Sequence, residues 1–200
     1  MAKKLVRKTR RLVVRPIELK DYEAWKKTHL SALPAQNLWD RGPRKSSELT
    51  KTVFAKMLRG MARQRKRDVF YDFCIFDKKG ALVGGCALME VARGISHTAY
   101  LGYRMFNRHW GKGYAKEPIR ACLDIGFRDL KLHRIEAGIE PQNRRSLMLA
   151  RTLGMRREGT KKRALYLRKK WVDLVMYTVT TEDVGYNFDK KVFKDWKPRV

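Results

Sequence analysis

The chain has 200 residues, 44% of them hydrophobic, which is enough for one compact domain with a packed core. It contains no run of 18 apolar residues that could form a transmembrane helix, and its basic start lacks the apolar segment of a secretory signal, which predicts a cytoplasmic location. Its 47 Lys and Arg against 20 Asp and Glu give a formal charge of +27, which favours an acidic partner such as RNA and disfavours polycations such as free polyamines.

The first third of the chain predicts one strand, two helices and a long loop. Residues 11–19 are expected to form a strand that leads into a helix over residues 19–33, where apolar side chains recur at helical spacing. Residues 32–47 contain two prolines and a glycine and therefore predict a loop. Ser46 or Ser47 is expected to cap the next helix, whose apolar stripe consists of Leu49, Val53, Phe54, Met57, Leu58 and Met61.

The rest of the chain alternates strands and helices. Two strands around a turn at residues 78–80 and a third strand over residues 97–106 precede a helix from Tyr114 to about Leu130. A short strand and a helix stopped by Gly154 follow, and the last pattern is a hairpin whose two strands flank a basic turn at residues 168–170. This order predicts an α/β (α+β) fold, a mixed sheet with helices over its faces.

No internal repeat or low-complexity linker divides the chain, so we expect a single domain over residues 1–185. Within it, residues 1–10 are expected to form a basic N-terminal arm. Residues 186–200 form a C-terminal tail to which the pattern assigns no role.

The loop before the helix at Tyr114 has the composition of an anion site. The first N–H groups of a helix have no partner within the helix, and the helix dipole places partial positive charge there. Gly111 and Gly113 allow the backbone to approach an anion, and Lys112 adds a cation. The spacing is neither that of a P-loop nor that of a dinucleotide-binding loop, because Lys116 stands where the third glycine would be. Alone, this pattern is weak.

Several further segments strengthen it by resemblance. The pieces "RLVVRP", "YLGYRMF", "WGKGYAKE", "HRIEAGIEPQNRRS", "LGMRREG" and "WVDLVMYTV" together resemble the GCN5-related N-acetyltransferases (GNAT), and within them the RimJ/RimL-type acetylases of ribosomal-protein N-termini. The resemblance implies a GNAT fold, a mostly antiparallel sheet splayed next to the strand at residues 97–106. It also implies acetyl-CoA as co-substrate, with no metal.

The resemblance also implies which residues bind coenzyme A. The pyrophosphate loop would be Trp110, Gly111, Lys112, Gly113, Tyr114 and Ala115. Its first residue is tryptophan instead of the usual glutamine or arginine, and Arg108 is a candidate for the missing charge. The backbone of Tyr103, Arg104 and Met105 would bind the pantetheine arm as an added strand, and Asn143 would hydrogen-bond it.

The catalytic residues are predicted from the same resemblance. Ala150 occupies the position of the tyrosine that many members of the superfamily use as an acid. Ser146, three residues after Asn143, matches the serine that replaces it in RimJ/RimL proteins, and Glu158 matches their proposed base. Glu117 is interpreted as structural rather than acceptor-facing, while Glu136 and Glu140 are alternative bases.

The remaining polar and sulfur-containing residues predict packing rather than chemistry. Cys74, Cys86 and Cys122 are widely spaced in apolar surroundings, which indicates buried thiols and neither a disulfide framework nor a zinc site. The histidines are assigned to surface or packing positions: His29, His97, His109 and His133. Four tryptophans are assigned to core or loop packing rather than to contacts with RNA bases: Trp25, Trp39, Trp110 and Trp171.

The sequence is compatible with three functions. The first is acetylation of a protein N-terminus, with the basic surface docking on ribosomes or other RNA-rich particles. The second is acetylation of a small-molecule amine. The third is a non-catalytic, ribosome-associated assembly factor. The loop at residues 33–47 is expected to shape the acceptor pocket, and the pattern does not indicate an oligomeric state.

Overall fold

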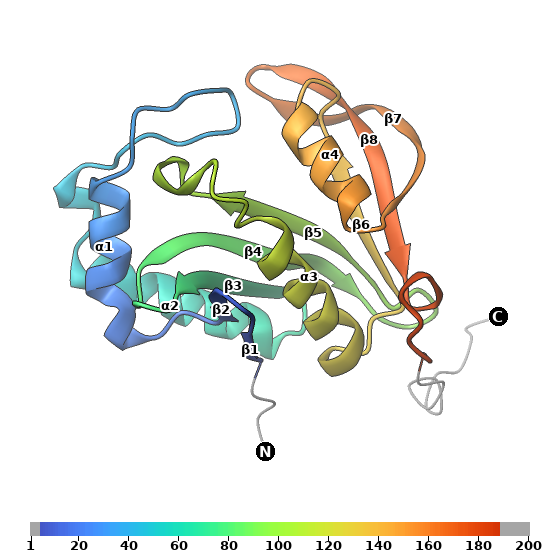
Figure 1. Ribbon diagram of the computed structural model, residues 1–200, viewed down its shortest axis with the longest axis horizontal. Coiled ribbons are helices and arrows are strands. Elements are labelled where there is room, and N and C mark those ends of the chain that lie inside the picture. Colours follow the sequence, from blue (N-terminus) through green and yellow to red (C-terminus); the bar gives the residue numbers. More distant parts are fainter. Residues whose placement is uncertain (1–4, 189–200) are drawn as a thin grey trace.

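The computed structural model describes residues 5–188, which form one mixed sheet with helices on both faces (Figure 1). Within these residues the sheet has eight strands in the order β1-β2-β3-β4-β5-β6-β8-β7. The strands are β1 (Arg7–Lys8), β2 (Leu12–Arg15), β3 (Phe70–Asp77), β4 (Leu82–Ala92), β5 (Thr98–Met105), β6 (Arg134–Ile139), β7 (Arg156–Leu167) and β8 (Lys170–Thr180). All neighbours are antiparallel except β5 and β6, which run parallel. The predicted fold class is confirmed.

The helices cover the two faces of the sheet in pairs. They are α1 (Tyr22–Leu30), α2 (Lys51–Lys66), α3 (Lys116–Asp124) and α4 (Arg144–Thr152). Along β3, Phe73 and Ile75 belong to the larger core cluster with α3 and α4, whereas Phe76 belongs to the smaller cluster with α1 and α2. Because successive strand residues point to opposite faces, the two helix pairs lie on opposite sides.

Several boundaries differ from the prediction, and two of them concern helices α2 and α3. Residues Ser46–Glu48 form a short 3-10 helix, and the cap of α2 is Thr50, whose hydroxyl accepts a hydrogen bond from the Val53 N–H at 3.2 Å. The helix predicted to reach Leu130 changes after Asp124 into a π-helical turn over Ile125–Asp129.

The N-terminal arm adds an element that the pattern did not predict. Arg7 in β1 is ion-paired with Asp124 and Asp129 near the end of α3. These contacts attach β1 to the helical layer as well as to β2. The rest of the predicted arm at residues 1–4 lies outside the described residues.

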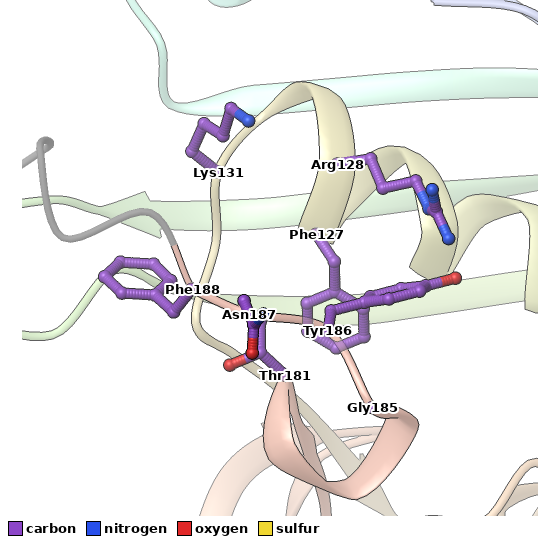
Figure 2. A pocket seen from close by; sticks show the side chains of 8 residues that line it. All are labelled: Phe127, Arg128, Lys131, Thr181, Gly185, Tyr186, Asn187 and Phe188. Atoms are coloured by element: carbon purple, nitrogen blue, oxygen red, sulfur yellow. The ribbon is translucent and has the colours of Figure 1, made fainter.

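The segment after β8 packs beside the same end of α3. The Tyr186 hydroxyl donates to Asp124 at 2.8 Å, and the Tyr186 ring meets the edge of Phe127 with the Arg128 guanidinium over its face (Figure 2). A cavity of about 360 Å³ lies here, and Lys131, Thr181 and Phe188 also line it. No predicted site residue lines this cavity. Residues 189–200 of the predicted tail lie outside the described residues.

Candidate functional site

The loop between β5 and α3 has the backbone that the glycines predict. Gly111 and Gly113 have φ angles of 75° and 62°, in the left-handed region that favours glycine. A Cβ added at either position would meet no atom within 4 Å. Glycine is therefore needed here for backbone conformation, and the space beside both residues stays open.

The first turn of α3 offers unpaired N–H groups beside this loop. Ala115 is the N-cap, and its side chain makes no capping hydrogen bond. Pro118, in the same turn, has no N–H group. The N–H groups of Ala115, Lys116 and Glu117 therefore remain for an anion, and the helix dipole supplies partial positive charge at the same point.

Arg11 orients the loop from the outside. Its guanidinium donates to the carbonyl oxygens of Lys112 at 3.1 Å and Gly113 at 2.8 Å, and it lies 4.9 Å from the centre of the Tyr114 ring. These bonds engage two loop carbonyls, which would otherwise repel an anion. Arg11 was not among the site residues predicted from the sequence, because it lies about one hundred residues before the loop.

Glu117 holds Arg11 in place. Its carboxylate accepts hydrogen bonds from the Thr9 hydroxyl, the Arg11 backbone N–H at 2.7 Å and the Arg11 Nε at 2.9 Å. Burial alone would raise the pKa of Glu117, but these hydrogen bonds outweigh it and lower the pKa to about 2. The contacts agree with the structural interpretation of Glu117.

Glu117→Gln is expected to lower the free energy of unfolding by about 1–3 kcal/mol near neutral pH, the usual effect of losing hydrogen bonds to a charged group. A carboxyl group with a depressed pKa in the folded state stabilises above its unfolded pKa, so the difference should shrink as pH falls from about 4.5 towards 2. Denaturant unfolding across this range measures it. Glu23→Gln, on the exposed side of α1, is the control, and a pH-independent difference would contradict the assignment.

The sheet opens next to this loop. β5 and β6 pair only from Thr98 to Tyr100, and beyond that point they run apart (Figure 1). The Phe106 N–H donates to Val83 on β4, so by alternation the backbone groups of Tyr103 and Met105 point into the gap. The Met105 carbonyl accepts from the Trp110 indole at 2.8 Å, which fixes this tryptophan over the end of β5.

The first turn of α4 forms the opposite wall. Asn143 is its N-cap, and its side-chain oxygen accepts from the Ser146 N–H at 3.2 Å. The Tyr103 hydroxyl donates to the Ser146 carbonyl at 3.3 Å, which links the strand to the helix across the gap. Burial raises the pKa of Tyr103, so its phenol stays protonated.

A cleft of about 650 Å³ joins these three parts. The predicted site residues that line it are Tyr103, Arg104, Met105, Trp110, Gly111, Gly113, Tyr114, Ala115, Asn143 and Ser146. Lys112 does not line it: its side chain is exposed, and its carbonyl binds Arg11. Ala150 is fully buried behind the α4 wall.

Glu158 lies elsewhere. It is on β7 and does not line the cleft; its carboxylate binds the Arg134 guanidinium and accepts from the Thr178 hydroxyl at 3.1 Å. These contacts, the Arg134 hydrogen bond first, lower the pKa of Glu158, which weakens it as a base. Glu136 shares the same arginine at 2.6 Å. The geometry therefore does not support Glu158 as the general base.

Glu140 ties two segments together at the open end of the gap. Its buried carboxylate accepts from the Trp39 indole at 2.6 Å and from Arg168 in the β7–β8 turn. The loop that carries Trp39 therefore reaches the hairpin, and both lie across the top of the opening (Figure 1). Glu140 acts as a structural link rather than as an available base.

The same loop is anchored to the end of β5 by Asn107. This buried side chain accepts from the Leu33 N–H at 3.0 Å and donates to the Leu33 carbonyl and to Asp40 at 2.8 and 2.9 Å. The loop residues Asn37, Trp39, Asp40 and Arg41 line the cleft, as expected for a segment that shapes the acceptor site. Asn107 was not among the site residues predicted from the sequence.

The remaining assignments agree with packing, with one exception. None of the three cysteines forms a disulfide in the described residues: Cys86 and Cys122 are buried, and Cys74 is partly buried. Residues 5–188 contain no group of three or more His, Cys, Asp or Glu that could hold a metal ion. Trp25 is buried, but Trp171 is 61% exposed, so its assignment to packing is wrong. Within the same residues, no helix has the length and apolar character needed to cross a bilayer.

Comparisons with known proteins agree with this geometry. Residues 11–156 match the family model described as an acetyltransferase (GNAT) domain. The chain is 34% identical to a probable N-acetyltransferase, YjcK, of Bacillus subtilis over 119 residues, 59% of this chain and 66% of that protein. It is also 34% identical over 120 residues to the [ribosomal protein uS5]-alanine N-acetyltransferase of Escherichia coli, 60% of this chain and 61% of that protein. In both cases the matched part is less than two thirds of the relative's length.

A solved structure, Mycobacterium smegmatis RimJ in complex with CoA-disulfide, has a TM-score of 0.75 and 24% identity. The match covers 91% of this chain and 90% of that one. At this identity the likeness shows the shared fold.

Proposed function

The chain belongs to the GNAT acetyltransferase family, and we propose that it transfers an acetyl group from acetyl-CoA to the α-amine at a protein N-terminus. One observation carries the proposal: a single cleft joins the glycine loop, the opened strand edge and the first turn of α4. Ten of the predicted binding residues line this cleft, although they come from three separate segments of the chain.

The residues present fit coenzyme A. The left-handed glycines, the uncapped first turn of α3 and the loop carbonyls bound by Arg11 suit a diphosphate. The backbone of Tyr103 and Met105 and the Asn143 side chain suit the amides of a pantetheine arm. When bound, this co-substrate supplies the acetyl thioester.

In the transfer, the amine nitrogen attacks the thioester carbon, a C–N bond forms and the C–S bond breaks. The nitrogen loses a proton, and the leaving sulfur takes one up. A protein α-amine has a pKa of about 7.7–8.0, so a neutral fraction exists near pH 7 without a strong base. We assign the role of proton donor to the Ser146 hydroxyl. This hydroxyl lines the cleft and makes no hydrogen bond with the described residues. The Tyr103 phenol is the second candidate, since it reaches the same turn.

Glu158→Gln is expected to leave kcat/KM within about threefold of wild type, because this carboxylate lies outside the cleft and its arginine partner keeps it a weak base. Initial rates with acetyl-CoA and a peptide acceptor measure the effect. A loss of 100-fold or more, the size expected of a general base, would restore Glu158 to that role.

A protein acceptor near RNA is favoured by the relatives and by the β7–β8 hairpin. The E. coli relative is named for acetylation of a ribosomal protein. In the hairpin, Tyr166 and Trp171 are 60% and 61% exposed, and their rings meet at 5.5 Å. Basic residues surround them in the strand and turn sequences: Lys161, Lys162, Arg163, Arg168, Lys169 and Lys170. Exposed aromatic rings among cations suit a nucleic-acid surface.

A panel of acceptors tests the proposal. The protein is incubated with acetyl-CoA and with free-N-terminus peptides, N-blocked lysine peptides or small amines, and thiol release is followed. Turnover with free N-termini alone is expected. Turnover with small amines alone would overturn the acceptor class, and binding of acetyl-CoA without any turnover would favour the non-catalytic role. Co-sedimentation with ribosomes that weakens steeply with salt would support the partner, and no co-sedimentation would refute it.

A further inference from the structure

A second cavity, of about 290 Å³, adjoins the cleft on the side of α1 and α2. It lies between the two helices, the loop at residues 31–45 and the faces of β3, β4 and β5. Arg41, Arg104 and Phe106 line both cavities, so the two meet at the end of β5. The second cavity therefore begins next to the strand edge where the pantetheine arm is proposed to bind.

Three arginines supply the charge of this cavity. They are Arg41 and Arg44 from the loop and Arg104 from β5, and no Asp or Glu is among the described residues that line it. Arg104 has no carboxylate within salt-bridge distance in the described chain; its guanidinium lies 4.9 Å from the Phe106 ring centre. Arg44 lies 3.8 Å from the Glu48 carboxylate, a long contact for an ion pair, and donates to the Glu48 backbone carbonyl at 3.4 Å. The positive charge is thus largely uncompensated.

The apolar side chains around the arginines favour their pairing with an anion. Trp25, Met57, Met61 and Leu82 line the same cavity, and apolar walls strengthen any ion pair formed between them. The Arg104 side chain keeps contact with solvent, yet desolvation by the surrounding protein lowers its pKa, and the neighbouring charge of Arg41 lowers it further. An anion in the cavity would offset both effects, because it would stabilise the charged form of the guanidinium.

The nearby titratable groups do not neutralise the arginines. Asp40 lines the first cleft, and its negative charge offsets part of the effect that Arg41 and Arg44 have on Arg104. Its carboxylate is held by the Asn107 amide at 2.9 Å and by the backbone N–H groups of Gln36 and Arg41, and it forms no ion pair with the three arginines in the described chain. His29 lines the second cavity with Nδ1 bound to the Trp25 carbonyl at 2.8 Å. Burial, and then the three arginines, lower the pKa of His29, so it stays neutral near pH 7.

We infer that the second cavity receives a carboxylate of the acceptor, so that the enzyme selects protein N-termini with an acidic side chain in the first three residues. This inference rests on the proposed function and names the acceptor class of the same site. Arg104 directly follows Tyr103, whose backbone faces the gap. An extended peptide advances about 3.3–3.6 Å per residue, so only the first few side chains can reach the Arg104 guanidinium.

The test compares peptides that begin Ala-Glu and Ala-Gln and are otherwise identical, with a second pair that places Glu or Gln third. In at least one of the two pairs, the wild-type kcat/KM is expected to be at least about 10-fold higher for the Glu peptide than for the Gln peptide. A ratio of this size corresponds to the free energy of one hydrogen bond to a charged group. In Arg104→Met the Glu/Gln ratio should fall to about one, and Arg104→Lys should restore part of it. Arg41→Met, on the exposed loop, should lower the ratio as an independent variant.

Arg59→Met is the matched control, because it removes the same charge from the exposed side of α2, away from both cavities. It should keep the wild-type ratio. Equal rates with Glu and Gln peptides in the wild type would overturn the inference and leave the proposed function standing. An equal fall of the Glu/Gln ratio in Arg59→Met would also overturn the inference, because the overall positive charge of the protein would then explain the preference. If no peptide is acetylated, the proposed function itself fails. Free glutamate and aspartate are assayed alongside the peptides, and acetylation of these amino acids alone would show that the acceptor is not a peptide.

Discussion

Replacing Gly111 and Gly113 together by alanine is expected to weaken acetyl-CoA binding by about 10–100-fold while the protein stays folded. Both glycines have left-handed backbones, and an alanine held there costs about 1–2 kcal/mol per residue. The loop is expected to leave this conformation, and its N–H groups would then no longer converge with those of α3. Because the added methyl groups would meet no atom within 4 Å, the loss would report backbone conformation rather than steric exclusion within the protein.

Titration calorimetry measures the affinity, with two controls. Gly80→Ala introduces the same strain at the β3–β4 turn, where φ is 84° and the added methyl also meets nothing within 4 Å. It should lower stability without changing acetyl-CoA affinity. Gly113→Asn should bind better than Gly113→Ala, since asparagine tolerates the left-handed region. Wild-type affinity in the double alanine variant would show that the loop does not bind the diphosphate.

Ser146→Ala is expected to lower kcat by about 100-fold while acetyl-CoA affinity changes by less than about threefold. Its hydroxyl lines the cleft at the first turn of α4, and a positioned proton donor contributes an effect of this size. The Ser146 backbone already makes the contacts to Asn143 and Tyr103, so the substitution should leave the turn intact. Single-turnover rates measure the chemical step separately from product release.

Tyr103→Phe is the companion variant, because it removes only the second hydroxyl near that turn. A small effect here and a large one at Ser146 would assign the donor to the serine. The reverse pattern would assign it to the phenol, which burial keeps protonated. Near-wild-type rates in both would show that neither hydroxyl donates the proton.

The order of helices and strands could be predicted from periodicity because each element buries one face in a shared core. The glycine loop and the Asn143 turn could be predicted because their chemistry lies in adjacent residues. The cap of α2 was placed too early, since Ser46 and Ser47 are as good cap types as Thr50. A residue type alone does not show which of several turns continues into the helix.

Contacts between distant segments could not be predicted in this way. Glu158 matches a motif position, yet Arg134, on another strand, takes up its carboxylate. Arg11 orients the loop from more than one hundred residues away. Arg104 was expected to contribute its backbone, while its side chain lines a cavity formed by the other two helices. Such roles depend on which strands become neighbours, and a single sequence does not state this.

Backbone amide chemical shifts during titration with coenzyme A test the central claim most directly, because they locate the bound diphosphate residue by residue. The largest changes are expected at Gly111, Gly113 and the first turn of α3, followed by Tyr103 and Met105 on the gap side of β5. Changes that centre on the cavity around Tyr186 (Figure 2), or no changes at saturating ligand, would contradict the account.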